Sequence, residues 1–418
     1  MLQGEYPILR VVLLCPYALD VPGGVQGQVM GLAGELSEMS IDVRVLAPAS
    51  GSGGNATRHT TAERSGKVPD ESSSELICNL EDSNMLRRGT IGIVGKSIPL
   101  RANGSVAPVD LSPVSWMRGI HSIGQGGYDL VHIHEPFAPG IGYMCMLKCR
   151  LPMVGTFHRA GAGFSYRLLS PLARYGASRI DRLCAVSYEA AKTACVALGE
   201  GYLPDNKDSR SIEVLWNGID TRRFTGTRSI LDSTSPVIIF VGRHEKRKGL
   251  QVLLEAFRDI SGLPEKPLLW VVGEGPETAM LQSMYGDDPG VIWLGVLRDE
   301  ELADKIAAAD ILCAPSLGGE SFGMVPLEAM AASTLIVASD IPGYRAVIGD
   351  YGILVPPGNA RLLSEGLMLG LDAVKNGKPP ASPEDLNRAK IHASEYSMHA
   401  LAASYAEIYE NVVSLSER

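Results

Sequence analysis

Short apolar runs alternate along the chain with longer stretches in which apolar residues recur at the spacing of a helix. This alternation is typical of parallel strands that are covered by helices, so we predict an α/β fold. In the first half of the chain, strands are predicted at residues 8–15, 43–47, 130–134, 153–157 and 182–186, and a helix at residues 25–37.

A second series of the same kind follows a polar stretch at residues 216–236, where we place a domain boundary. Its predicted strands cover residues 237–241, 268–272, 291–294, 311–314 and 335–338, and its helices cover residues 249–260, 299–308 and 324–332. The chain ends in an amphipathic helix predicted at residues 398–413.

These elements predict two Rossmann-like, doubly wound parallel-sheet domains, residues 1–220 and 221–395, that face each other across a deep cleft. Ligands of such sheets bind at the carboxyl ends of the strands, so the cleft is the expected site. Residues 396–418 are expected to form a C-terminal helix that crosses back to the first domain. Residues 50–90, rich in glycine, serine and charge, are expected to form a surface insertion.

Composition narrows the class of function. The formal net charge of -9 argues against nucleic acid as a partner, because phosphate backbones select basic surfaces. The apolar N-terminal run is interrupted by Arg10 and ended by Pro16, which favours a buried strand over a signal peptide. No apolar stretch reaches the length of a membrane span, and the seven cysteines form no Cys-x-x-Cys pair, so we expect a cytoplasmic protein.

Two loops between a strand and a helix have the chemistry of phosphate sites. Residues 20–25 (DVPGGV) place adjacent glycines at the start of the first helix, where backbone N–H groups can meet an anion. Residues 242–249 (GRHEKRKG) carry four basic side chains that could neutralise a diphosphate. The alternatives are a plain tight turn for the first loop and a solvated basic loop for the second.

Two further groups of polar residues are candidates. Glu320, in a glycine-rich turn, and Glu328, on the helix that follows, could accept hydrogen bonds from ligand hydroxyls. His158 ends a first-domain strand and is either a cleft residue or a satisfied core histidine. His132 and His134 share one strand face, which favours a structural strand end and leaves a metal pair as the alternative. The sequence contains no Asp-x-Asp, so no metal is expected to hold the ligand.

Taken together, these motifs resemble family 4 glycosyltransferases of the GT-B fold. The resemblance covers nearly the whole chain and rests on the glycine loop, the basic block, residues 217–220 (NGID) and the pair Glu320 and Glu328. Residues 15–26 (CPYALDVPGGVQ), 132–136 (HIHEP) and 314–323 (APSLGGESFG) are similar to the actinobacterial phosphatidylinositol mannosyltransferases within that family. The resemblance implies retaining, metal-independent hexose transfer without a cofactor.

The resemblance also implies roles for individual residues. On the donor side, Gly24 would hold the diphosphate through its backbone, and Arg243 and Lys248 would pair with it as the glycosidic bond breaks. The helix N-terminus at Phe322 and Gly323 would add to that stabilisation. Glu328 would contact the ribose, Glu320 the hexose hydroxyls and Leu297 the base. His158 would lie beside the reacting sugar, and the acceptor side would be lined by Tyr17, Asp20 and Gln26.

The implied partners are a nucleotide-diphosphate sugar, GDP-mannose in the mannosyltransferases, and a lipid acceptor at the inner face of the membrane. Phe137, Pro108 and Gly163 stand where those enzymes carry asparagine, arginine and lysine at acceptor-phosphate positions, although Arg159 could substitute for the lysine. Another donor or acceptor, a GT-B nucleotide-sugar epimerase and a non-catalytic sugar-nucleotide binder therefore stay open. The oligomeric state is not indicated.

Overall fold

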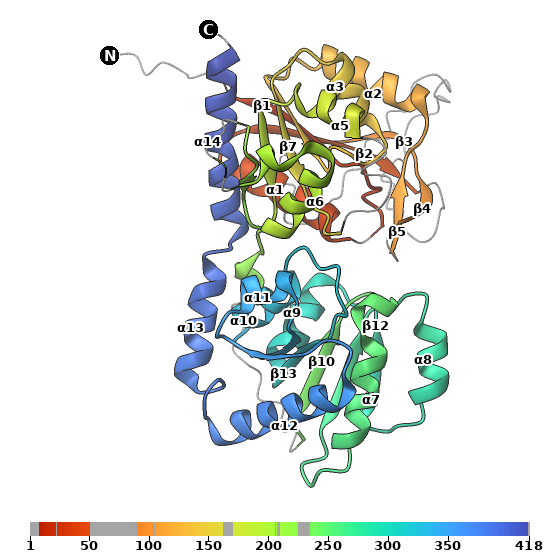
Figure 1. Cartoon of the computed structure of the whole chain (residues 1–418), viewed down its shortest axis with the longest axis vertical. Helices are drawn as coiled ribbons and strands as arrows, with labels where there is room; N and C mark the ends of the chain where they lie inside the picture. Colours follow the sequence, from red (N-terminus) through yellow and green to blue (C-terminus); the bar gives the residue numbers. More distant parts are fainter. Residues whose placement is uncertain are drawn as a thin grey trace, which may run out of the picture.

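A computed structural model of the chain describes residues 8–21, 23–50, 90–102, 105–161, 170–204, 206, 210–224 and 235–416. Within these residues two parallel sheets form, each flanked by helices, and they lie one above the other in Figure 1. Almost all of the insertion predicted at residues 50–90 lies outside the described residues.

The first sheet has the strand order β3-β2-β1-β6-β7-β8-β9, and all its strand pairs are parallel. Its strands are β1 (Arg10–Leu14), β2 (Asp42–Ala49), β3 (Thr90–Lys96), β6 (Leu130–His134), β7 (Met153–Phe157), β8 (Arg182–Ala185) and β9 (Glu213–Val214). Its helices are α1 (Gly24–Glu38), α2 (Pro113–Gln125), α3 (Ile141–Lys148), α5 (Ser170–Ala177), α6 (Tyr188–Leu198) and the short η1 (Glu200–Tyr202). A separate antiparallel hairpin joins β4 (Ile98–Ala102) to β5 (Ser105–Val109).

The second sheet is also parallel, with the order β12-β11-β10-β13-β14-β15. Its strands are β10 (Val237–Val241), β11 (Leu268–Val272), β12 (Val291–Gly295), β13 (Ile311–Ala314), β14 (Leu335–Ser339) and β15 (Ile353–Val355). Its helices are η2 (Thr221–Phe224), η3 (Lys246–Lys248), α7 (Leu250–Ile260), α8 (Thr278–Tyr285), α9 (Asp299–Ala308), α10 (Met324–Ala331), α11 (Pro342–Ile348), α12 (Ala360–Asn376) and α13 (Pro383–Ser394).

The central strands are buried on both faces, which explains why they are apolar throughout. In β1, Val12 and Leu14 belong to the core under one layer of helices, whereas Val11 and Leu13 belong to the core under the other layer. Strand β10 divides its side chains between two second-domain cores in the same way. The ten strands predicted from the sequence are all present, with small differences at their ends.

The last helix, α14 (Met398–Ser416), returns to the first domain and runs along its side in Figure 1. One helix face is apolar because Tyr405, Tyr409 and Val412 recur at intervals of four and three residues. This face packs with α1 and β1 in a single core, so the predicted crossing-back of the C-terminal helix is confirmed. In the described part of the chain, no helix is both long and apolar enough to span a bilayer.

Candidate active site

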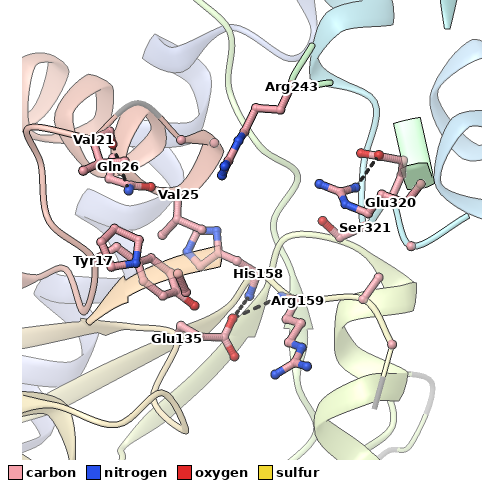
Figure 2. A pocket seen from close by; sticks show the side chains of 18 residues that line it. Tyr17, Val21, Val25, Gln26, Glu135, His158, Arg159, Arg243, Glu320 and Ser321 are labelled. Carbon is pink, nitrogen blue, oxygen red and sulfur yellow. Dashed lines mark hydrogen bonds and ion pairs between the residues drawn. The ribbon is translucent and has the colours of Figure 1, made fainter. Parts of the chain in front are cut away.

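A pocket of about 420 Å³ opens between the two domains and is lined by both of them (Figure 2). Six of the residues that the sequence analysis proposed meet there, although they come from distant parts of the chain. They are Tyr17, Gly24, Gln26, His158, Arg243 and Glu320.

Strand order explains why these residues meet. The order of each sheet reverses direction at one point, between β1 and β6 in the first domain and between β10 and β13 in the second. The loops that follow such strands diverge, which leaves a crevice at the carboxyl edge of the sheet. Tyr17 and Gly24 follow β1, His158 follows β7, Arg243 follows β10 and Glu320 follows β13, so the two crevices face each other across one pocket.

The glycine loop exposes backbone to the pocket. Gly23 caps α1 without any side-chain hydrogen bond, so the first N–H groups of the helix have no side-chain acceptor there. A side chain on Gly23 would collide with Gln26, whereas a Cβ atom on Gly24 would meet no atom within 4 Å. The Gln26 amide donates to the carbonyls of Ala18 and Val21, at 3.3 and 3.1 Å, and so fixes the loop. Gly24 therefore offers open backbone to a ligand.

Positive charges of the basic loop at residues 242–249 are paired with carboxylates. Glu320 Oε1 lies 2.7 Å from a guanidinium nitrogen of Arg247 and 2.8 Å from Nζ of Lys248. Burial acts to raise the pKa of Glu320, but the charges of Lys248 and Arg247 outweigh it and hold the pKa below its usual value. Lys248 is therefore tied to the pocket through Glu320, although it does not line it.

Arg243 points into the pocket from the second domain, as Figure 2 shows. Its guanidinium lies 3.5 Å from a carboxylate oxygen of Glu245, which is buried and also pairs with Arg247 at 3.2 Å. The sequence analysis did not single out Arg247 or Glu245. Both residues lie in the basic loop at residues 242–249, which is the only sign of them in the sequence. The pairing of Arg247 with Glu320 depends on the fold.

His158 is held at the pocket through both its backbone and its ring. The backbone N–H groups of His158 and Arg159 donate to one carboxylate oxygen of Glu135, at 2.9 and 3.1 Å. The ring Nε2 of His158 lies 2.9 Å from Nδ1 of His134. Burial lowers the pKa of His158 to about 3, so its imidazole is neutral at neutral pH. The sequence left His158 as either a cleft residue or a core histidine, and only the resemblance put it beside the sugar. Glu135 was given no role.

His132 and His134 lie inside the first domain. The two ring nitrogens of His132 bond the hydroxyls of Tyr409, at 2.6 Å, and Thr156, at 2.8 Å, which satisfies both. The described residues contain no group of three or more histidine, cysteine, aspartate or glutamate side chains arranged to hold a metal ion. These contacts agree with the structural role that the sequence favoured for His132.

The other proposed residues lie outside the lining of this pocket. The Asp20 carboxylate accepts hydrogen bonds from the backbone and hydroxyl of Ser50 at the end of β2. Phe322 is buried and stacks on Trp216 with ring centroids 5.6 Å apart, and Gly323 caps α10. Leu297 packs on the second-domain core. The roles assigned to these residues stay predictions.

Glu328, on α10, is half-buried beside an ion pair. The pKa of Glu328 is raised to about 7. Burial is the largest cause, the charge of Arg223 acts to lower the pKa, and the charge of Asp299 acts to raise it. Arg223 and Asp299 themselves pair at 3.2 Å. Glu328 is thus a carboxyl that titrates near neutral pH, and its assignment to the ribose stays a prediction.

Two of the three positions that the sequence analysis named as departures from the mannosyltransferases lie among the described residues. Phe137 is buried, and its ring centroid lies 5.0 Å from that of Phe157, so it fills the first-domain core. Pro108 lines the pocket, and its carbonyl accepts a hydrogen bond from the Ala18 N–H at 3.0 Å. Gly163 lies outside the described residues. The difference from those enzymes at Pro108, and its place on the acceptor side, stay predictions.

Solved structures share the whole arrangement. HepE of Anabaena, in complex with UDP and glucose, has a TM-score of 0.70 at 18% identity, with 96% of this chain and 100% of that chain covered. Sucrose-phosphate synthase from Thermosynechococcus elongatus also has a TM-score of 0.70 at 18% identity, with 97% and 100% covered. At this identity the likeness concerns the fold, and it confirms the predicted GT-B arrangement of two doubly wound domains.

Sequence comparison identifies the family. Phosphatidyl-myo-inositol mannosyltransferase of Mycobacterium leprae is 31% identical over 412 residues, which cover 97% of each chain. The enzyme of the same name from Mycolicibacterium smegmatis is 33% identical, with 97% of this chain and 94% of that protein covered. Residues 22–223 match Glycosyltransferase Family 4, and residues 235–370 match Glycosyl transferases group 1. The chain therefore belongs to glycosyltransferase family 4.

Proposed function

We propose that this glycosyltransferase transfers mannose from GDP-mannose to a lipid such as phosphatidyl-myo-inositol and keeps the anomeric configuration. One observation carries the proposal: a single pocket joins the basic loop of the second domain to Tyr17, Gln26 and His158 of the first. The names of the relatives, which match over nearly the full length, support the choice of sugar and acceptor.

The donor is expected to bind mainly to the second domain. Arg243, Arg247 and Lys248 supply three positive charges near the pocket, and Gly24 supplies open backbone from the opposite wall. In the structure, Arg247 and Lys248 are paired with Glu320. We expect the diphosphate to compete for these cations, which would free the Glu320 carboxylate to accept hydrogen bonds from hexose hydroxyls.

As the glycosidic bond breaks, negative charge develops on the leaving diphosphate. Fixed cations in a cleft that excludes water stabilise such charge strongly, and removing one donor of this kind costs about 100- to 1000-fold in rate. Arg243 and Lys248 would do this work without a metal, in keeping with the lack of an Asp-x-Asp motif in the sequence. Neutral His158 is suited to orient the sugar through a hydrogen bond, and the acceptor hydroxyl would attack from the leaving-group side.

A lipid acceptor requires the protein to reach a membrane surface, which we propose to be the inner face. Large apolar side chains are exposed on the β4–β5 hairpin and at the start of α2, and these are Ile98, Leu100, Leu111, Val114 and Met117. Such a surface could bury its apolar side chains in the boundary of a bilayer.

A second candidate function is transfer to a different lipid or small-molecule acceptor. Pro108, at the pocket, favours it, because the resemblance implies a charged residue at this position and proline offers no charge to an acceptor phosphate. The donor half of the proposal is the same for both candidates, so the choice of acceptor can be tested separately.

The deciding experiment compares GDP-mannose, UDP-glucose and UDP-GlcNAc with phosphatidylinositol vesicles, and measures labelled sugar in the lipid phase. Mannose in the lipid would support the proposal. Donor binding without transfer would favour the second acceptor class, and an isomerised sugar formed without acceptor would indicate an epimerase. Binding that never leads to turnover with any acceptor would indicate a sugar-nucleotide binder.

A further inference from the structure

His134 lies directly behind the pocket and does not line it. It ends β6, is 2% exposed, and reaches the site through one contact, the 2.9 Å hydrogen bond from its Nδ1 to Nε2 of His158. Since burial lowers the pKa of both imidazoles, the two neutral rings share one bridging proton. The bond occupies Nε2 of His158 and leaves Nδ1 as the other ring nitrogen of this pocket residue.

The second ring nitrogen of His134 has an unusual position. Nε2 is buried and has no hydrogen-bond partner among the described residues. An unpaired buried polar atom costs free energy, which an apolar side chain of similar size would avoid. The only hydrogen bond described for the ring is the one to His158. The contact with His158 is therefore the one that requires a polar side chain at position 134.

The ring of His134 is itself held in place from behind. It packs on the ring of His132, with centroids 4.1 Å apart. His132 cannot turn without breaking its bonds to Tyr409 and Thr156, and the hydroxyl of Thr156 also bonds that of Tyr405 at 2.8 Å. Both tyrosines belong to α14, so the returning C-terminal helix supports the histidines that lead to the pocket.

From this arrangement we infer that His134 is a positioning residue: it holds the Nε2 edge of the His158 ring so that Nδ1 is presented to the sugar in the pocket. The inference rests on the proposed function for the identity of the bound sugar. The orientation of the His158 ring does not depend on that identity, since it follows from the ring-to-ring bond alone.

The test uses two substitutions in the full chain, His134→Phe and His134→Asn. Phenylalanine keeps a ring but cannot hydrogen-bond, whereas the asparagine amide can replace Nδ1. We expect His134→Phe to lower kcat for mannose transfer about 100-fold with KM for the donor unchanged, because a small misplacement near the reacting centre costs about that much. His134→Asn should restore most of the activity.

A second readout does not depend on turnover. In protein labelled with 15N-histidine, the ring signals of His158, assigned by their loss in His158→Gln, should change in His134→Phe and return in His134→Asn. Unchanged signals and kcat in His134→Phe, or equal loss in both His134 variants with a normal melting temperature, would overturn the inference. If the wild type transfers no mannose, the proposed function fails, and the ring signals still decide the role of His134.

Discussion

Glu320 illustrates how one side chain takes part both in the charge balance of the site and in the chemistry expected of it. Its carboxylate pairs with both Arg247 and Lys248, and the hydroxyl of Ser316 donates to it at 3.2 Å. In Glu320→Ala both cations lose this carboxylate, although Arg247 keeps its pair with Glu245, so we expect GDP to bind at least as tightly as in the wild type. Turnover should fall by about 100-fold or more because the contact with the sugar is lost. Calorimetry and steady-state kinetics measure the two effects.

A matched control for this variant is Glu265→Ala. Glu265 also pairs with a lysine, Lys375, at 2.7 Å, but it lies on the surface of the second domain away from the pocket. It should leave GDP affinity and turnover unchanged. Full activity of Glu320→Ala would refute the role assigned to Glu320.

The glycines of α1 allow a second test at the residue scale. Alanine at Gly24 would meet no protein atom, so Gly24→Ala should fold normally, yet its methyl group would stand where a phosphate is expected to approach. Losing a hydrogen bond to a charged group costs about 1.5–3 kcal/mol, which corresponds to a roughly 10- to 150-fold weaker affinity for GDP. Titration calorimetry checks this.

Gly27→Ala is the control for that experiment. Gly27 lies one turn further along α1, has equally open space around it and does not line the pocket. Alanine there should raise helix stability by up to about 1 kcal/mol and leave GDP affinity unchanged. Equal affinities of the two variants would show that the backbone at Gly24 does not hold the nucleotide.

Among the elements, β6 and the end of β7 carry three buried histidines that should control stability at mild acid pH. Burial lowers the pKa of His132 and His158 to about 3 and that of His134 well below its ordinary value. Between about pH 3 and 6.5 the unfolded chain therefore binds more protons than the folded one. The free energy of unfolding should fall as pH drops below about 6.5, by up to roughly 1.4 kcal/mol per histidine and pH unit.

Urea unfolding at several pH values from 7.5 to 5 measures this slope. Glu328 acts in the opposite direction, because its raised pKa of about 7 makes the folded state bind the extra proton between about pH 4.5 and 7. The series is therefore best repeated in Glu328→Gln, where the decline towards acid pH should be steeper. Stability that stays constant from pH 7 to 5 in Glu328→Gln would contradict the buried, neutral state of the histidines.

Most of the strands that the sequence predicted are buried on both faces, which makes a strand apolar throughout. Strands β9 and β15 have only two and three residues, so they carry too little pattern to be recognised. Helix α12 was also missed, and glycines in its interior weaken its local signal. Gly366 and Gly370 allow close packing, since Cβ atoms there would lie 2.7 Å from Val355 and 3.0 Å from Ile311. Their benefit depends on the assembled fold.

The residues of the candidate site also divide into those that the sequence reveals and those whose role depends on the fold. Residues in recognisable loops, such as Gly24, Arg243 and Glu320, could be found because glycine and charge at strand ends are visible in the sequence. The contribution of Glu135 could not, because its carboxylate acts on backbone N–H groups 23 and 24 residues away. The domain limits proposed at residues 220 and 395 stay predictions.

At the scale of the whole molecule, the orientation of the two domains depends on a narrow region where the chain crosses between them twice. The crossings run side by side, since the Ile219 N–H donates to the Tyr396 carbonyl at 2.8 Å and the Met398 N–H donates to the Ile219 carbonyl at 2.9 Å. Arg222 and His399, one from each crossing, both contact the buried carboxylate of Glu35 on α1. Helix α1 thus fastens both crossings to the first domain.

Gln28 of α1 makes the most direct of these connections. Its side-chain amide bonds both backbone groups of Gly218, with Nε2 2.6 Å from the carbonyl oxygen and Oε1 3.0 Å from the nitrogen, and Nε2 also lies 3.5 Å from Sδ of Met324 at the start of α10. Because the pocket needs both domains, loss of these bonds should affect catalysis from a distance.

In Gln28→Leu we expect a less fixed domain orientation and two unpaired buried backbone groups at Gly218. Each such group costs about 1–3 kcal/mol, so the melting temperature should fall by several degrees. The value of kcat/KM should fall about tenfold or more, because the two walls of the pocket would meet less often in the productive arrangement. X-ray scattering should show a broader range of domain arrangements without a nucleotide, and GDP should narrow it.

Gln251→Leu, at an exposed glutamine that bonds only Glu255 among the described residues, should change none of these values. If Gln28→Leu matched it in scattering and kinetics, the crossings alone would fix the domains, and the bonds from α1 would be dispensable for holding the pocket together.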